Sequence, residues 1–465
     1  MIAISQATIN EDRPKNLINR FFYTDLFPLF VGLIAFISWA NNLTLIGLGV
    51  FVFIACYIFV SQEDMTPIIP LLFCVIMLFR SLATASKTAT FIILAPAVLC
   101  VLIHVFKYRY TPNLGKLFFP LIGVTIALFI GGINSYYVSD YLRGLPTMIS
   151  IGPGLIIVYL FFLNYIRPPK GVNLKTYLCK CVILMTLFAC FEAAFSLYNY
   201  KILKNTLFVP YELGWSNINN VGTLILLSVP LCFYLLVKTK KIVPYFMLSM
   251  VFLGYAFMIN SSAALFFLVL SLPVLFIYSY LKLPKQKRLI LRNCIFSFVA
   301  IATAIIFIVL ATNFAAMERY IEVLMSYSGR ESLYNKAVEL IKEHPILGVG
   351  FGYHNAGSSM DFKFENLRIY NFHCTFLQVL ASMGIVGMFA YVFYYIQRIR
   401  IFTEKDTRFS KFAFISFLLF SFHGIFDTCE FNMIPLLIVL TLILVVVEVE
   451  SYKPKKPSFY PPIIF

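Results

Sequence analysis

Arg330, His344, His354 and His373 lie in or beside one polar stretch between two long apolar runs of the sequence. An imidazole can take a proton from a hydroxyl group near neutral pH, and a planar guanidinium offers paired donors to phosphate oxygens. The same residue types are also typical of membrane surfaces, where histidine avoids hydrocarbon and arginine contacts lipid headgroups. Residue type alone therefore leaves a chemical interpretation and a structural one open.

His373 differs from the other histidines because it begins an apolar run. If that run is a helix, its positive end opposes protonation and favours a neutral imidazole. A neutral imidazole can accept a proton, so His373 is a candidate general base.

The composition shows that these residues belong to a membrane protein. The chain of 465 residues is 60% hydrophobic and only 12% charged, and its mean hydropathy is +0.86. A soluble domain carries about 25% charged residues. The net charge of +16 comes from short basic runs between apolar segments, which is the pattern of cytoplasmic membrane loops and gives no support to nucleic-acid binding. The N-terminal residues show no cleavable signal peptide, so we expect the first apolar run to stay in the membrane.

The apolar runs predict an all-α fold, a polytopic membrane helix bundle of about 12–14 transmembrane helices. A helix needs about 17 to 25 apolar residues to cross a bilayer. No boundary or repeat divides the chain, so residues 1–465 are predicted to form a single integral membrane domain. The candidate spans are 26–42, 43–60, 66–80, 88–106, 117–133, 146–166, 177–198, 220–237, 242–259, 261–281, 289–312, 373–396, 410–426 and 432–449.

The basic runs predict the orientation, because lysine and arginine are retained on the cytoplasmic side. With both termini cytoplasmic, every concentrated basic loop, including Arg398–Lys411, also falls inside. This orientation makes residues 313–372 one large extracytoplasmic loop. Apolar residues at helical spacing predict two amphipathic helices in it, over 314–327 and 332–343.

Pro345 is predicted to end the second of these helices, and Gly348, Gly350 and Gly352 then allow tight turns. These glycines do not form a dinucleotide fingerprint, because no strand precedes them and no helix start follows them. Walker A and H-E-x-x-H motifs are likewise missing from the sequence, and the external histidines lack metal-ligand spacing. We therefore expect no metal site and no cofactor.

Several further charged residues fall at predicted external span ends or within spans. Charge inside a membrane is costly and usually faces a cavity or a partner, which makes Glu192 the most informative of them. Pairing of Glu192 with a neighbouring span and contact with substrate both remain open. The set is Arg80, Lys87, Asp140, Arg143, Glu192, Lys201, Lys204, Asp427 and Glu430.

The order of motifs resembles the bacterial O-antigen ligase and O-antigen polymerase superfamily. After many spans, the chain reads G-R-E-S-L-Y-N-K-A-V-E-L-I-K-E-H-P-I-L-G-V-G and then H-C-T-F-L-Q-V-L-A-S-M-G-I-V-G. A weaker similarity is W-S-N-I-N-N-V-G, which includes Asn217 and Asn220. The residues that match the main pattern are Arg330, Pro345, Gly348, Gly350, His373, Leu377, Gly384 and Gly387.

Two departures from the family pattern concern residues near the expected site. Where members of the family commonly have serine followed by arginine, this chain reads N-S-S-A-A-L from Asn260, so a phosphate contact there must come from another residue. The acid often found before G-I-V-G is replaced by Ser382. Either change could indicate a different acceptor or glycan.

The resemblance implies a membrane glycosyltransferase that uses an undecaprenyl-pyrophosphate-linked oligosaccharide as donor, outside the cytoplasm, without a metal. It implies catalytic roles for Arg330 at the pyrophosphate and His373 at the acceptor glycan's hydroxyl. Arg143 or Arg80 could also contact the pyrophosphate, and the other candidates for substrate binding are Asn217, Asn220, His354 and Glu192. The implied location is a bacterial inner or plasma membrane.

Three functions remain open at this point. The first is polymerisation of repeat units of a surface polysaccharide such as O-antigen, capsule or exopolysaccharide, with a chain-length regulator and a flippase as possible partners. The second is ligase-type transfer of glycan to a lipid or other acceptor. The third is a lipid-linked oligosaccharide flippase or transporter, although such proteins frequently show two similar halves and this sequence shows no repeat.

Overall fold

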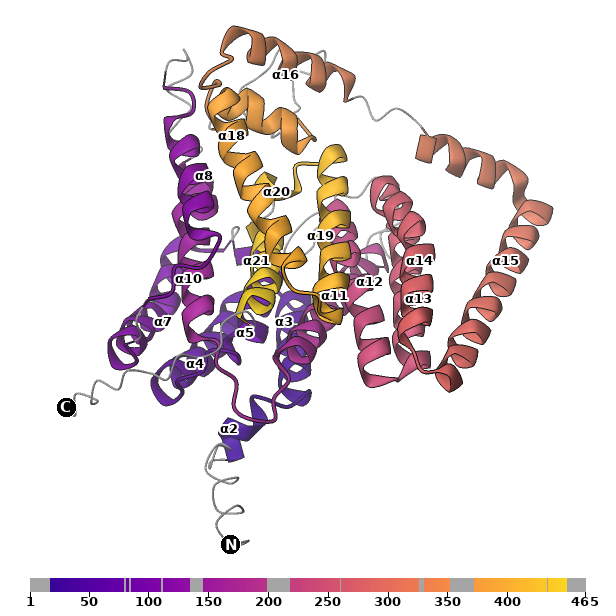
Figure 1. Ribbon diagram of the computed structural model, residues 1–465, viewed down its shortest axis with the longest axis horizontal. Helices are drawn as coiled ribbons and strands as arrows, with labels where there is room; N and C mark the ends of the chain where they lie inside the picture. The colour runs from indigo at the N-terminus through magenta and orange to yellow at the C-terminus, as the bar shows by residue number, and fades with distance from the viewer. Residues whose placement is uncertain are drawn as a thin grey trace, which may run out of the picture. The chain divides into compact units, whose positions relative to one another are not determined.

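The computed structural model describes residues 17–78, 81–82, 85–109, 112–133, 145–198, 218–259, 261–325, 330–351, 372–432 and 434–449, and these contain helices and no strand (Figure 1). The helices are α2 Leu17–Phe21, α3 Leu26–Ala40, α4 Thr44–Ser61, α5 Ile68–Met77, α7 Lys87–Lys107, α8 Phe118–Ile130, the π-helix η1 Ser150–Gly154, α10 Leu155–Tyr165, α11 Leu174–Leu197, α12 Ile218–Thr239, α13 Ile242–Met258, α14 Ser262–Lys282, α15 Lys285–Met325, α16 Glu331–Glu343, α18 Thr375–Thr403, α19 Arg408–Phe426, α20 Cys429–Asn432 and α21 Ile434–Val449.

Each predicted span corresponds to a helix, which confirms the all-α fold class. Nine helices in the described part of the chain are long and apolar enough to cross a membrane. Five further apolar helices there are shorter, at 10–17 residues: α3, α5, α8, α13 and α21. The chain is a multi-pass membrane protein.

The helix α15 is longer than the sequence predicted. A span over 289–312 followed by a separate amphipathic helix over 314–327 was expected, but one helix runs from Lys285 to Met325. The reason is that this segment contains neither proline nor glycine, so nothing interrupts its backbone hydrogen bonds. In Figure 1 the ribbon of α15 changes direction before its C-terminal end, without a break in the helix.

The chain divides into two compact units. Unit 1 comprises Met1–Gly115, Ile157–Val221 and Ile438–Phe465, and unit 2 comprises Lys116–Ile156 and Gly222–Leu437. The single integral membrane domain remains a prediction, and each unit is described by itself.

In unit 1, α3 packs on α5 and α11, and α4 packs on α7. The loop after α4 carries Asp64, a buried carboxylate that joins three segments. Its Oδ1 accepts hydrogen bonds from the backbone N–H of Thr66 (3.1 Å), the hydroxyl of Thr66 (2.8 Å) and the backbone N–H of Arg167 (2.6 Å). Its Oδ2 accepts the hydroxyl of Tyr23 at 2.9 Å. The loops that precede α3, follow α4 and follow α10 therefore meet at one side chain.

In unit 2, α18 packs on α8, α16 and α19. Gly384 interrupts α18 with φ +60° and ψ −159°, a conformation that glycine adopts without the penalty of a Cβ. The helix therefore consists of two parts, and the first part follows directly after His373. This arrangement makes α18 the element around which the candidate site is built.

Candidate active site

The helix α16 is held on α18 by a small apolar core. Ala337, Leu340, Val349, Phe372 and Ala381 form this core, and all five are almost completely buried. The predicted amphipathic helix over 332–343 is confirmed by α16, Glu331–Glu343. Arg330 occupies the N-cap position of α16, so the packing of this helix determines where the guanidinium can reach.

The turn after α16 completes the broken backbone of α18. At the interruption, the carbonyls of Ala381 and Ser382 accept hydrogen bonds from the N–H groups of Val349 (2.8 Å) and Gly350 (3.0 Å). The N–H of Ile385 in turn donates to the carbonyl of Pro345 at 2.9 Å. Backbone groups that a continuous helix would satisfy internally are thus satisfied by the turn.

The glycines of the turn allow this close approach. Gly348 has φ +67°, and a Cβ there would collide with the backbone of Ala381 and Ser382. A Cβ on Gly384 would likewise collide with the carbonyl of Ile346. The P-x-x-G-x-G and G-I-V-G patterns are therefore two halves of one contact, which fixes α16 with Arg330 against α18 with His373.

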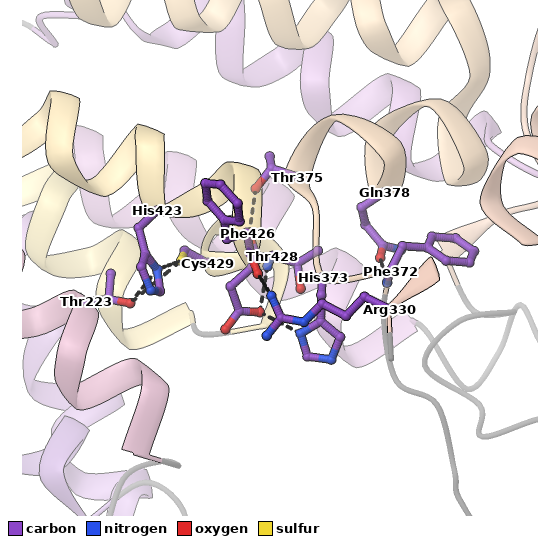
Figure 2. Close-up of polar contacts among 11 residues, drawn as sticks. Thr223, Arg330, Phe372, His373, Thr375, Gln378, His423, Phe426, Thr428 and Cys429 are labelled. Carbon is purple, nitrogen blue, oxygen red and sulfur yellow. Dashed lines mark hydrogen bonds and ion pairs between the residues drawn. The ribbon is translucent and has the colours of Figure 1, made fainter. Parts of the chain in front are cut away.

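His373 lies just before α18 and contacts Asp427 from the end of α19. Its Nδ1 is 3.1 Å from Asp427 Oδ1 (Figure 2). The His373 backbone has φ +49°, in the left-handed region that non-glycine residues rarely adopt. The preceding Phe372 N–H donates to Gln378 Oε1 at 3.1 Å, and Gln378 Nε2 donates to Ser382 Oγ at 3.0 Å. These bonds hold the turn that presents the imidazole.

The electrostatics of Asp427 determine which nitrogen of His373 carries a proton. Burial alone would raise the pKa of Asp427, but the hydrogen bond and charge of His373, the nearby His423 and the N–H of Thr428 together hold this pKa below its ordinary value. An ionised carboxylate can only accept hydrogen bonds, so His373 Nδ1 must donate. In the neutral imidazole, Nε2 is then the nitrogen that can accept a proton. The His373 side chain is 33% exposed whereas Asp427 is 5% exposed, so the imidazole is accessible and the carboxylate is not.

Arg330 contacts the residue next to Asp427. Its Nη1 donates to the backbone carbonyl of Phe426. Thr375, in the first turn of α18, donates its hydroxyl to the Asp427 carbonyl at 3.3 Å. The Arg330 and His373 side chains both point toward this short segment in Figure 2. The structure thus brings together the two residues predicted to be catalytic.

A second polar cluster lies one turn earlier on α19. His423 Nδ1 is 3.2 Å from Thr223 Oγ1 and 3.0 Å from Cys429 Sγ. All three side chains are buried, so this cluster links α12, α19 and α20 rather than offering a surface to a ligand. His423 contributes to the site through its charge interaction with Asp427.

The remaining predicted site residues are distributed differently. Glu192 on α11 is fully buried, and Asn220 on α12 is almost fully buried. Both lie in unit 1, whereas His373 and Arg330 lie in unit 2, and their roles in substrate binding stay predictions. The other four candidates, Arg80, Arg143, Asn217 and His354, lie outside the described residues.

Asp427 is the residue whose role the sequence did not reveal. In the sequence it is only one of nine charged residues at predicted external span ends or within spans. The available signal was F-D-T-C-E-F directly after an apolar span, where two acids stand at a membrane boundary.

Among the residues that the structure describes, no three His, Cys, Asp or Glu side chains gather into a possible metal site.

The fold and this site define an all-helical, multi-pass membrane protein with an imidazole–carboxylate pair beside a guanidinium. Residues 247–392 match the family model described as O-antigen ligase. The match contains the motif residues from Arg330 to Gly387, and it confirms the predicted resemblance to the O-antigen ligase and polymerase superfamily. It covers less than half of the chain and ends before Asp427. Comparison with curated proteins gave no match.

Proposed function

We propose that this protein polymerises repeat units of a surface polysaccharide, taking glycan from an undecaprenyl-pyrophosphate-linked donor and joining it to a sugar hydroxyl. The observation that carries the proposal is the contact of His373 Nδ1 with the buried Asp427 carboxylate, with Arg330 on the adjacent carbonyl. The matched family consists of membrane glycosyltransferase-like enzymes, and the pair supplies the base that such a transfer uses.

The proposed step moves one proton and exchanges one bond. His373 Nε2 takes the proton of the acceptor hydroxyl as its oxygen attacks the donor sugar's anomeric carbon. The bond from that carbon to the pyrophosphate oxygen breaks, and lipid pyrophosphate leaves with the electron pair. Arg330 stabilises the negative charge that develops on the leaving group, because a guanidinium donates in parallel to two oxygens. Asp427 stabilises the imidazolium that forms.

Ligase-type transfer is the second candidate, because the matched model is described as O-antigen ligase. Polymerase and ligase share the donor and the chemical step and differ only in the acceptor. A flippase would need neither a base nor a leaving-group contact, so the His373–Asp427 pair favours transfer over transport.

The decisive experiment is transfer by the purified protein in lipid nanodiscs. The donor is a lipid-linked repeat unit, offered with a second repeat unit or with a lipid-core acceptor, and the products are sized by mass spectrometry. We expect longer lipid-linked chains and released undecaprenyl pyrophosphate, with the rate unchanged by excess chelator. Movement of the donor across proteoliposomes without any new glycosidic bond would replace the proposal by transport, and activity restored by one divalent ion would refute metal independence.

We propose further that the site faces outward in a bacterial inner or plasma membrane, with both termini cytoplasmic and residues 313–372 outside. Positively charged loops are retained on the cytoplasmic side, which supports this orientation. A topology reporter fused after Glu343 tests it, and a cytoplasmic signal there would contradict it.

A further inference from the structure

Arg398 and Glu430 form a fully desolvated ion pair in unit 2. Arg398 lies on the second part of α18 and is 0% exposed. Its Nη1 donates to Glu430 Oε1 at 2.9 Å and its Nη2 donates to Oε2 at 3.1 Å, so the two planar groups meet in a fork. The ring centre of Tyr394 lies 4.1 Å from the guanidinium carbon and adds a cation–π contact. The sequence had placed Arg398 in a basic loop, but α18 continues to Thr403 and buries it.

A pair of this kind is a poor source of stability. Removing two charges from water costs several kcal/mol per ion, about as much as their attraction returns, so a well-packed apolar pair is often as stable. The pair instead fixes an orientation, because two parallel hydrogen bonds hold the Glu430 carboxylate in one position relative to the Arg398 guanidinium. A small cavity lies beside Glu430 and is lined by Tyr391, Tyr394 and Phe431 among others.

The fixed orientation of Glu430 affects the candidate site because Glu430 lies close to Asp427 in the chain. Glu430 belongs to the one-turn helix α20 and stands three residues after Asp427. The segment between them is short, so fixing Glu430 limits where the Asp427 carboxylate can lie. On the other side, Thr375 holds the Asp427 carbonyl. The two residues that restrain this segment, Thr375 and Arg398, both belong to α18, the helix that follows His373.

We propose that Arg398 is a positioning residue that, through Glu430, holds the Asp427 carboxylate on His373. The proposal rests on the proposed function, because it assigns Arg398 to the base of the transfer step. Arg398 touches neither donor nor acceptor in this scheme. It acts by keeping residues 427–430 in a fixed position against α18.

The test replaces the pair by apolar side chains of similar length, in Arg398→Met/Glu430→Met. We expect parental thermal stability and an unchanged KM for the lipid-linked donor, with kcat reduced about 10–100-fold, the scale at which loss of a histidine's orienting partner is felt. The matched control is Glu448→Gln, which alters a buried carboxylate of unit 1 that accepts the Tyr159 hydroxyl at 2.7 Å, and we expect it to keep parental kcat. Parental kcat in the double Met variant would overturn the proposal.

Two further measurements separate positioning from general damage. In an Asp427→Asn background, removing the pair should reduce kcat no further, because coupled residues are non-additive; a full multiplicative loss would overturn the proposal. Should the Met pair fail to fold, Arg398→Lys keeps the charge without the fork and should still reduce kcat, whereas a parental rate would count against the fork.

A spectroscopic measurement tests whether Arg398 holds the Asp427 carboxylate on His373, even if no glycan transfer is found. In histidine-labelled protein, the Nδ1–H proton of His373, assigned with His373→Gln, should show its carboxylate hydrogen bond in the parent and lose it in the Met pair. A parent that transfers no glycan would refute the proposed function, while the same proton signal would still decide whether Arg398 holds Asp427. An unchanged signal in the Met pair would overturn the positioning role.

Discussion

Two buried aspartates, one in each unit, show how the same side chain serves two purposes. Asp64 is bonded by two hydroxyls and two backbone N–H groups and faces no cationic side chain among these donors. Burial outweighs those hydrogen bonds and raises the pKa of Asp64 to about 6. Asp427 is equally buried, yet the imidazoles of His373 and His423 reverse the effect of burial and its pKa falls below the ordinary value.

The difference lies in the partners' ability to change charge. Hydroxyl and amide donors fix the position of Asp64 but do not gain or lose a proton near neutral pH. This carboxylate therefore connects loops by hydrogen bonds and has a structural role. His373 can gain a proton and is partly exposed, so in the proposed step Asp427 stabilises the imidazolium that forms when the acceptor hydroxyl loses its proton. A titratable partner that is partly exposed is therefore what distinguishes Asp427 from Asp64.

The largest effect is expected from removing the base. His373→Ala should reduce the transfer rate by about 10²–10⁴-fold, the usual contribution of positioned proton transfer, while donor binding persists. Product length and donor binding are measured at matched membrane abundance. The control is His344→Ala, at the C-terminal end of α16, which should be milder because no contact links it to Asp427. Normal chain length in the His373→Ala protein would show that the base is elsewhere.

Neutralising each carboxylate in turn separates the roles of Asp427 and Asp64. Asp427→Asn keeps the shape but removes the charge that favours the donating Nδ1, so we expect about a 10–100-fold loss of kcat. Asp64→Asn should leave kcat at the parental value, since Asp64 faces no histidine in its hydrogen bonds. Equal losses in both variants would mean that carboxylate burial, and not contact with His373, determines the effect.

A smaller loss is expected when the guanidinium is replaced by another cation. Arg330→Lys keeps the positive charge but loses the paired donors, so we expect about a tenfold lower kcat, equivalent to about 1.4 kcal/mol in the transition state. The rate is measured with saturating lipid-linked donor. Lys336→Arg, which changes a partly exposed cation of α16 paired with Glu339, serves as the control and should be neutral. A parental rate for Arg330→Lys would remove Arg330 from the pyrophosphate.

Much of this fold could be predicted because a membrane restricts the choices of the chain. Long apolar runs have to satisfy their own backbone groups, so each run became a helix. The ends of helices were harder to predict, since hydropathy reports where a membrane ends and not where a helix does. Thus α15 continues beyond its apolar part to Met325, and α18 continues past Arg398.

The site was predictable only where its parts are close in sequence or share a motif. Arg330 and His373 were recognised within one ordered pattern, and the structure adds that its glycines join the two helices concerned. Asp427 lies 54 residues after His373, directly after the helix α19, and Glu430 pairs with a residue 32 positions earlier. Such contacts depend on how helices pack, which the one-dimensional pattern of apolar residues does not contain.

The smallest effect is expected at Asp64, and it concerns stability rather than rate. Its pKa is about 6 in the folded protein and ordinarily 3.8, so the folded state binds a proton more readily than the unfolded state. This contribution to stability is fully present below about pH 4 and is lost as pH rises through about 6. For Asp427, whose pKa is lowered, the contribution is present above the ordinary pKa and is lost as pH falls through the folded one. The two carboxylates thus oppose each other in acid.

Asp64→Asn should therefore flatten the parent's decline in thermal stability between about pH 4 and 6, measured as apparent Tm in nanodiscs. The amide oxygen can keep the three bonds that Oδ1 accepts, and its NH₂ can donate to the Tyr23 hydroxyl, which in turn can donate to Gln62 Oε1, 3.1 Å away. The substitution thus keeps the hydrogen bonds between the loops and removes the negative charge. Asp427→Asn, measured in the same pH series, should change the slope with the opposite sign and only at lower pH. If the Asp64→Asn curve keeps the parent's slope, folding does not raise the pKa of Asp64, and the contrast between the two buried carboxylates would rest on the partners of Asp427 alone.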